Sequence, residues 1–362
     1  TTRRSPPNPL RPNGTDTPAC PHKCVTKTQG RHPESAPNIS CGSVRSLIHR
    51  SFDGLHVCAQ PRYIWEMAFL IEPGAPRTRT ARLRIPTNGV RAEINDDDWW
   101  TDLQAIALVL PEHAIFSHTT AARIAGIPLP EVDPRPFHVT VPHHRGRRNG
   151  IVWHQRPMPD EPEYVRGFRV TGPLQTWLDL GSVLDVDDLV AAADLLLRRG
   201  LVAPDTLKAV PPVRGANLLR SAAALASPRS WSPRESLLRM AMHRHGLPEP
   251  ALNVEIIEDG IVLGTGDLVF DEFRCIVDYD GDTHREWQQR IQDTQTRNAY
   301  GQAGWIHLGV TSHMFDRMPR TLISIESMLR RRGWSDPCTP RELPSRKDGR
   351  VTRAIPPRTR AS

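Results

Sequence analysis

The most regular alternation of apolar and polar positions lies in the last third of the chain. Ser232 followed by Pro233 and Glu235 predicts a helix that begins with the serine as N-cap. This helix is expected to end at Gly246. Apolar runs on both sides of Asp259-Gly260 predict a β-hairpin. Further strands are predicted at residues 266–270, 275–280 and 305–310, and further helices at residues 285–303 and 320–332. The expected order is helix, three or four strands, helix, strand and helix.

Acidic residues interrupt two of these apolar strands. Asp267 stands in one run, and Asp278 and Asp280 stand in the next, where alternate residues face the same side. Neighbouring carboxylates repel each other, and folding tolerates them when a hard divalent cation such as Mg²⁺ lies between them. Such a cation can activate water and stabilise charge on a phosphate. The pattern predicts a nuclease-type metal site, although Asp267 and Asp280-Gly281, taken singly, are also common turn residues.

The middle of the chain carries the pattern of an α+β module. Helices are predicted at residues 100–110, in the later part of 114–126, from residue 173 onward, at 189–197 and at 218–226. Strands are predicted at residues 137–142, 151–154 and 168–171. A basic turn between the first two strands carries Arg145, Arg147 and Arg148, which either contact phosphate or are simply solvated. Ser117 and His118 suggest a nucleophile pair, but adjacent side chains rarely point at each other. Ser117 is therefore expected to cap a helix.

The two ends of the chain have weak periodicity, and the chain divides into four parts. We expect a poorly ordered, Pro-rich region at 1–95, the α+β module at 96–228, a second folded domain at 229–335 and a disordered basic tail at 336–362. Cys20, His22 and Cys24 could supply half of a zinc site. Their spacing to Cys41 and Cys58 is not that of a standard zinc finger.

Composition favours a nucleic-acid partner. The 362 residues carry a net charge of +7, much of it from arginine, and guanidinium groups pair well with phosphate. Arginine-rich composition also arises in proteins encoded by GC-rich genomes, so the charge supports this interpretation without establishing it. The apolar run at 64–71 is too short to span a bilayer. No secretory signal pattern is recognised, and we expect a cytoplasmic protein without membrane contact.

The segment from Pro233 to Arg332 resembles the very-short-patch-repair-like endonuclease domains of the PD-(D/E)xK superfamily. The matching residues are Glu235, Asp267, residues 277–281, His284, Asp293 and Arg297. The resemblance implies a restriction-endonuclease-like mixed sheet flanked by helices, dependence on Mg²⁺ and hydrolysis of phosphodiester bonds in DNA. It makes Asp267 and Asp278 the metal ligands, with Glu235 reaching the metal or a bound water. It gives His284 the role of proton carrier, places Asp280 where many members have lysine, and lets Arg297 contact DNA.

The middle module resembles a second family, the AbiEi-type antitoxin-like proteins of abortive-infection systems. The residues that carry this resemblance are 116–122, 126–129, 137–141, 171–173 and 176–180. It implies a role near toxin–antitoxin or defence systems and a toxin or other protein partner. Members usually carry a DNA-binding winged helix at their N-terminus, and the periodicity of one is not found before Asp96.

Two functions follow from these observations. The first is a Mg²⁺-dependent DNA endonuclease in repair or defence, whose catalytic residues would be Glu235, Asp267, Asp278, Asp280 and His284. The second is an antitoxin-like protein or transcriptional regulator whose nuclease fold is catalytically inactive. The acidic residues favour the first function, whereas Asp280 in the place of lysine favours the second.

Overall fold

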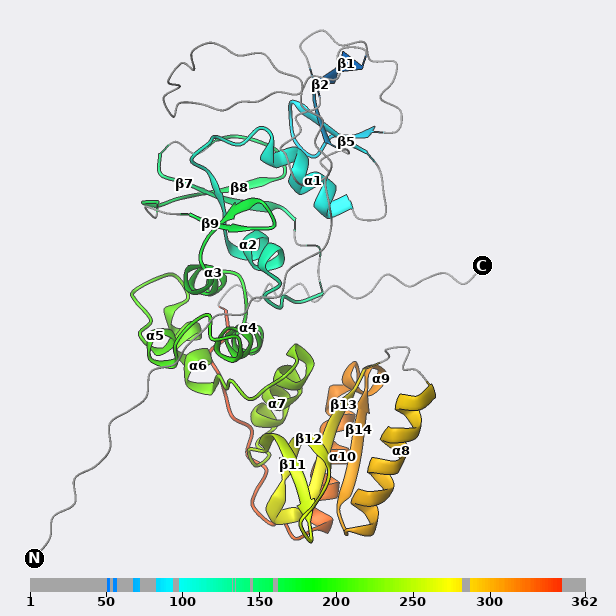
Figure 1. The fold of residues 1–362 in the computed structure, drawn as a ribbon. Coiled ribbons are helices and arrows are strands. Elements are labelled where there is room, and N and C mark those ends of the chain that lie inside the picture. Colours follow the sequence, from blue (N-terminus) through cyan, green and yellow to red (C-terminus); the bar gives the residue numbers. More distant parts are fainter. Residues whose placement is uncertain are drawn as a thin grey trace, which may run out of the picture. The chain divides into compact units, whose positions relative to one another are not determined.

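The computed structural model describes residues 51–52, 55–56, 68–71, 83–93, 98–131, 133, 135–143, 146–158, 162–281 and 287–346. These residues form a mixed α/β protein with three sheets, of which the second and third are mixed and flanked by helices (Figure 1). The expected combination of helices and mixed sheets is confirmed at this level. Among the described residues, no helix has the length and apolar character needed to cross a bilayer.

The first sheet lies in the region that was expected to be poorly ordered. Its strands, in the order β1-β2-β3-β5-β4, are β1 (Ser51–Phe52), β2 (Leu55–His56), β3 (Ala68–Ile71), β4 (Leu83–Arg84) and β5 (Val90–Glu93). Val90 and Ala92 of β5 are buried with Ala105 of helix α1 (Asp98–Ala107). The region expected to be poorly ordered thus contains five strands among its described residues, and these strands are too short to show a clear two-residue period. The predicted half zinc site at Cys20, His22 and Cys24 lies outside the described residues.

The second sheet belongs to the middle module and has the order β8-β7-β6-β10-β9. Its strands are β6 (Ile115–Phe116), β7 (Phe137–Val141), β8 (Ile151–Gln155), β9 (Glu163–Val165) and β10 (Phe168–Val170). Strands β7 and β8 pair in parallel, so the expected turn back between them is wrong. The nine-residue connection is long enough, when extended, to cross back over a five-residue strand. Helix α2 (His118–Ala125) packs on β7 and ends at Gly126 in the left-handed region.

A helical core follows this sheet. It contains α3 (Pro173–Leu180), α4 (Val186–Arg198), the short α5 (Pro204–Lys208) and α6 (Ala216–Leu225). The indole of Trp177 is fully buried and donates a hydrogen bond to the carbonyl of Leu189, which joins α3 to α4. The N-cap of α3 is Gly172, and the Thr171 hydroxyl next to it lies 2.7 Å from the Thr176 hydroxyl.

The C-terminal domain follows the predicted order of elements. Its elements are α7 (Pro233–His245), β11 (Ala251–Glu258), β12 (Ile261–Phe270), β13 (Cys275–Asp280), α8 (Trp287–Gln302), β14 (Ile306–Thr311), α9 (Ser312–Phe315) and α10 (Met318–Arg331). The sheet has the order β11-β12-β13-β14, with β13 and β14 parallel. Asp259 and Gly260 both have positive φ, as the tight hairpin turn between β11 and β12 requires.

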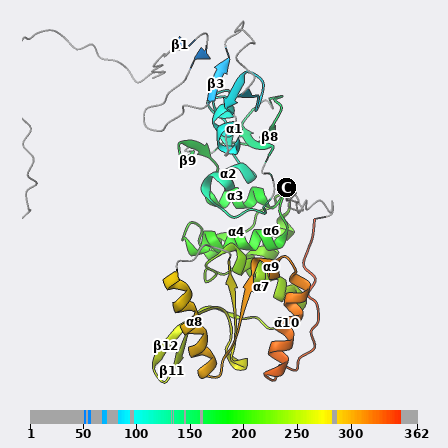
Figure 2. The same ribbon diagram turned by 90° about the vertical axis from the view of Figure 1, so that its right-hand side faces the viewer.

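The two faces of this sheet are covered by different helices. Val277 and Cys275 of β13 pack with apolar residues of α7 and α10, whereas Ile276 packs with Tyr300 of α8. Figure 2 shows α8 and α10 on opposite sides of the sheet. Because strand residues alternate in direction, Asp278 and Asp280 share the face of Ile276 and lie under α8.

Helix α7 belongs to two cores at once. Leu238 and Met242 pack on the C-terminal sheet, while Met240 packs into the helical core of the middle module. Arg239 of α7 pairs with the buried Asp194 of α4 at 3.1 Å. The segments 96–228 and 229–335 are therefore joined by buried polar and apolar contacts rather than by a linker alone.

The segment after Asp336 was expected to be a disordered arm. Its described part, as far as Arg346, instead follows the end of α7. The Arg341 backbone N–H donates to the carbonyl of Arg244, and the Arg341 guanidinium donates to the carbonyl of Leu247. Leu343 packs against the helical core. The described residues of the expected tail thus contact the end of α7 through Arg341 and the helical core through Leu343, and residues 347–362 lie outside the described part.

Candidate functional site

A polar cavity of about 300 Å³ is lined by residues of helix α8, of strands β12 and β14 and of the end of β13. Three of the predicted acids, Asp267, Asp278 and Asp280, line it together. Its wall is completed by Gly264, Thr265, Tyr279, Asp293, Thr296, Arg297, Tyr300, His307 and Gly309. The structure thus brings together residues that are more than forty positions apart in the sequence.

Asp267 and Asp278 hold the cavity wall by exchanging hydrogen bonds with each other's strand. The Asp267 backbone N–H donates to Oδ1 of Asp278 at 2.8 Å. The Tyr279 backbone N–H donates to Oδ2 of Asp267, also at 2.8 Å. The regular pairing of β12 with β13 stops at Leu268 and Val277, immediately before these residues. Each carboxylate therefore satisfies a backbone donor that the sheet no longer pairs.

The charge of Asp267 is poorly compensated. Burial raises its pKa to about 7, with further contributions from the negative charges of Asp278 and Glu235. The hydrogen bond from Tyr279 opposes this shift but does not overcome it. A nearby cation would stabilise the ionised form of a carboxyl group in this environment, because its positive charge offsets the neighbouring negative charges.

Glu235 lies near Asp267 but is engaged in the start of α7. Ser232 Oγ accepts the Glu235 backbone N–H at 3.1 Å, which confirms the predicted N-cap. Glu235 Oε2 accepts hydrogen bonds from the Trp231 backbone and from Asn253 Nδ2, both at 2.8 Å. Glu235 is buried and is not part of the cavity wall. Its negative charge nevertheless acts on Asp267 and raises the pKa of that group.

Asp280 and Arg297 face each other at the mouth of the cavity. Nη2 of Arg297 lies 2.8 Å from Oδ2 of Asp280, and both side chains are partly exposed. Arg297, for which a contact with DNA was predicted, therefore lines the cavity and pairs with Asp280. An exposed pair of this kind costs little to open, so both groups remain able to exchange partners.

Two further residues of the site were missed by the sequence analysis. His307 on β14 places Nε2 at 2.7 Å from Oδ2 of Asp278. Tyr300 on α8 is almost fully buried, and its hydroxyl has no hydrogen-bond partner among the described residues. Burial raises the pKa of Tyr300 to about 12, with the charges of Asp278 and Asp267 adding to the shift. The available signal for His307 was a histidine inside an otherwise apolar strand.

Several predicted residues are not part of this cavity. His284 and Arg145 lie outside the described residues. Arg147 and Arg148 belong to the connection between β7 and β8, where Arg148 Nη1 donates to the carbonyl of Asn88 at 2.6 Å. This hydrogen bond gives Arg148 an intramolecular partner, and the expected phosphate contact of these arginines stays a prediction.

The expectation for Ser117 and His118 is wrong in one respect. Ser117 is the N-cap residue of α2, but its side chain makes no capping hydrogen bond. Instead its Oγ lies 3.0 Å from Nδ1 of His118 and accepts a hydrogen bond from the Thr140 hydroxyl at 2.8 Å. His118 has a φ of 51°, which is an unusual backbone conformation for a residue other than glycine, and its ring lies beside the Ser117 side chain.

Comparisons with known proteins identify no relative. No family model, no curated protein sequence and no solved structure matches this chain. Function therefore has to be inferred from the residues of the cavity themselves.

Proposed function

We propose that the C-terminal domain is a Mg²⁺-dependent endonuclease that hydrolyses phosphodiester bonds in DNA, in repair or defence. The observation that carries the proposal is the pair Asp267 and Asp278, held together in a polar cavity with the pKa of Asp267 raised to about 7. The order of elements, with a mixed sheet between helices, is also that expected of a restriction-endonuclease-like domain.

The residues of the cavity fit a magnesium ion. Oδ1 of Asp267 makes no hydrogen bond with any described residue, so it remains available as a ligand. Oδ2 of Asp278 is shared with His307 and would be the second ligand. Carboxylate oxygens are what Mg²⁺ prefers, and it usually keeps several water molecules, for which the cavity has room.

When bound, the metal would polarise the scissile phosphate and acidify a water molecule. The protein's own groups then have defined tasks. His307 can hold a proton at Nε2, from which it donates a hydrogen bond to Oδ2 of Asp278. The Tyr300 hydroxyl, which lacks a partner, can donate a hydrogen bond into the cavity. Arg297 can leave Asp280 for a phosphate oxygen, because guanidinium binds both anions in the same geometry.

The alternative is an antitoxin-like protein or regulator that binds DNA through an inactive nuclease fold. One observation favours it: Asp280, which stands where the resemblance leads us to expect lysine, is paired with Arg297. The net charge of the chain, +7, suits DNA binding in either case. Binding to DNA alone does not separate the two functions, and cleavage does.

The test is relaxation of supercoiled plasmid in Mg²⁺ or Mn²⁺ by the full chain. Wild type is compared with Asp267→Asn, Asp278→Asn and the control Glu272→Gln. The control removes one exposed acid of the same domain that is not in the cavity wall. Asparagine keeps the size of the side chain and one oxygen for the backbone hydrogen bonds.

We expect wild type and Glu272→Gln to nick the plasmid, and both cavity variants to bind DNA without cutting it. If wild type binds linear, supercoiled and single-stranded DNA and cuts none of them with either metal, the endonuclease proposal fails. The inactive, regulatory alternative then stands.

A further inference from the structure

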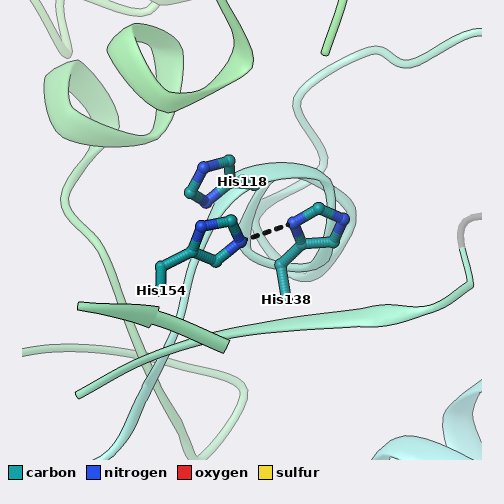
Figure 3. Close-up of side chains that lie close together, drawn as sticks. All are labelled: His118, His138 and His154. Carbon is teal, nitrogen blue, oxygen red and sulfur yellow. Dashed lines mark hydrogen bonds between the residues drawn. The ribbon is translucent and has the colours of Figure 1, made fainter. Parts of the chain in front are cut away.

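Three histidines from separate elements meet in the middle module. His118 begins α2, His138 lies in β7 and His154 lies in β8 (Figure 3). In the parallel pairing of the two strands, Thr140 is opposite His154. His138 is two residues before Thr140, so both histidines project from the same face of the sheet. Phe137 and Val139, by contrast, belong to the apolar core.

The imidazole rings are close enough to share one ion. One ring nitrogen from each histidine lies within 4.8 Å of the other two. Nδ1 of His138 is 2.9 Å from Nε2 of His154, the contact drawn in Figure 3. The rings of His118 and His154 stack with centroids 3.7 Å apart and planes inclined by 18°. Nitrogen atoms that bind one tetrahedral Zn²⁺ at 2.0–2.1 Å are roughly 3.3 Å apart, so the separations of these ring nitrogens are already close to those of a ligand set.

Two of the three histidines, His118 and His138, are held in the neutral form that binds metals. Burial lowers the pKa of His118 to about 2, and His154, His138 and Arg156 add to the shift. Burial, followed by the effect of His154, lowers the pKa of His138 to about 4. Neutral imidazole has a lone pair on one ring nitrogen, so it can bind a metal without first losing a proton to solvent.

The surroundings of His118 orient its ring as a metal ligand. Its Nδ1 lies 3.0 Å from Ser117 Oγ and 3.6 Å from a carboxylate oxygen of Asp179. Asp179 is itself fixed by two hydrogen bonds from Arg156 and one from Gln175. A carboxylate beside Nδ1 favours the tautomer with its proton there, which leaves Nε2 as the ligand atom. The positive φ of His118 is the kind of backbone strain that clusters at binding sites.

We propose that His118, His138 and His154 bind a divalent transition-metal ion, for which Zn²⁺ is the natural occupant, and leave one coordination position open. Three imidazoles suit zinc and its neighbours, whereas Mg²⁺ requires oxygen ligands. His138 and His154 are only partly buried, which gives an ion a route into the site. Three protein ligands with a free position form the set that zinc uses to activate water.

Binding requires a defined rearrangement. Rings that ligate one ion diverge from it, so the stacked rings of His118 and His154 must tilt apart. The hydrogen bond between Nδ1 of His138 and Nε2 of His154 is replaced by two metal bonds, and the proton between them moves to the other nitrogen of the donor ring. The ion would tie α2 to β7 and β8 and stabilise the middle module. This site is separate from the cavity of the C-terminal domain, and the proposal does not depend on the proposed nuclease activity.

The test uses the full chain after removal of metals with a chelator. Zn²⁺ is titrated by calorimetry, and Co²⁺ is titrated with visible absorption as the readout. The variants are His138→Gln and His154→Gln, and the control is His143→Gln, which changes an exposed histidine of the same module. Thiolate ligands add an intense near-ultraviolet band to Co²⁺ spectra. This band distinguishes the site from cysteine-containing groups such as His245, Glu326 and Cys338.

We expect wild type and His143→Gln to bind one ion with the spectrum of tetrahedral, thiolate-free Co²⁺. Each of the other variants should bind it more than about 100-fold more weakly, which exceeds the loss of 10–100-fold typical of groups that only support a ligand. Zn²⁺ should also raise the melting temperature of wild type but not of the variants. If folded wild type shows no thiolate-free Co²⁺ site at micromolar concentrations, or both variants retain it, the proposal is overturned.

Discussion

Asp267 and Asp278 each accept a hydrogen bond from the strand that carries the other, at 2.8 Å in both directions. The two carboxylates are thereby fixed at the point where β12 and β13 separate. Their remaining oxygens are directed to the cavity and to His307. Two carboxylates held this close repel each other, and the cation proposed to bind between them would offset this repulsion.

The first prediction concerns stability and pH in the absence of metal. Folding raises the pKa of Asp267 from 3.8 to about 7. Its contribution to the free energy of unfolding is therefore fully present below pH 4 and is lost as the pH rises through 7. Asp267→Asn removes the ionisation but keeps an oxygen for Tyr279. We expect the variant to be more stable than wild type at pH 8, by about 1–2 kcal/mol after discounting for solvent screening.

Urea unfolding with a chelator present, at pH 5 and pH 8, measures this difference. The advantage of the variant should shrink at the lower pH. An equal effect at both pH values would show that the charge of Asp267 is not the cause.

The second prediction separates catalysis from stability at Tyr300. Tyr300→Phe keeps the aromatic ring in its core and removes a hydroxyl that has no described partner. Removing an unsatisfied buried hydroxyl should not reduce the free energy of unfolding. If the hydroxyl donates to a charged group during cleavage, the rate should fall by about 10–100-fold. A variant that cuts at the wild-type rate would remove Tyr300 from the mechanism.

The third prediction tests the close approach of α8 to the sheet. A Cβ at Gly264 would collide with the Tyr300 hydroxyl and would come within 2.7 Å of Thr296. Gly264→Ala should therefore push α8 away and cost about 1–3 kcal/mol in the free energy of unfolding. The control is Gly301→Ala, in α8 itself, where a Cβ meets nothing within 4 Å. This control should be stabilising by about 0.5–1 kcal/mol. Chemical denaturation of both variants gives the comparison, and equal stabilities would contradict it.

The fourth prediction concerns the junction of α4 and α7. Asp194 accepts hydrogen bonds from Arg239, from Ser236 Oγ and from the backbone of Ser227. Asp194→Ala leaves a buried guanidinium without its partner and should cost about 3–5 kcal/mol. Asp187→Ala is the control, because it breaks the half-exposed pair with Arg244 in the same junction and should cost less than about 1 kcal/mol. Thermal unfolding should remain a single transition only in wild type and the control.

The sequence was sufficient for elements whose signals are local. The start of α7 follows from Ser232 and Pro233, and the β11–β12 turn follows from Asp259-Gly260. The shared location of Asp267, Asp278 and Asp280 followed from their positions in adjacent apolar strands. The short strands β1 to β5 gave no such signal, because two to four residues do not establish a period.

Features made by distant contacts could not be predicted. Tyr300 and His307 join the site only because α8 and β14 return to the β13 face. The parallel pairing of β7 with β8 brings His154 beside His138, and a hairpin would have paired them differently. Glu235 matched the pattern of the nuclease family. Its carboxylate accepts hydrogen bonds from Trp231 and Asn253, and these contacts at the start of α7 account for its burial.

The most direct test of a cation between Asp267 and Asp278 is binding of Mn²⁺ followed by electron paramagnetic resonance, in the absence of DNA. Wild type and Glu272→Gln should bind one ion that Mg²⁺ displaces, while the double variant Asp267→Asn/Asp278→Asn should lose this ion and keep its fold. The same displaceable Mn²⁺ binding in wild type and the double variant would contradict the proposed site.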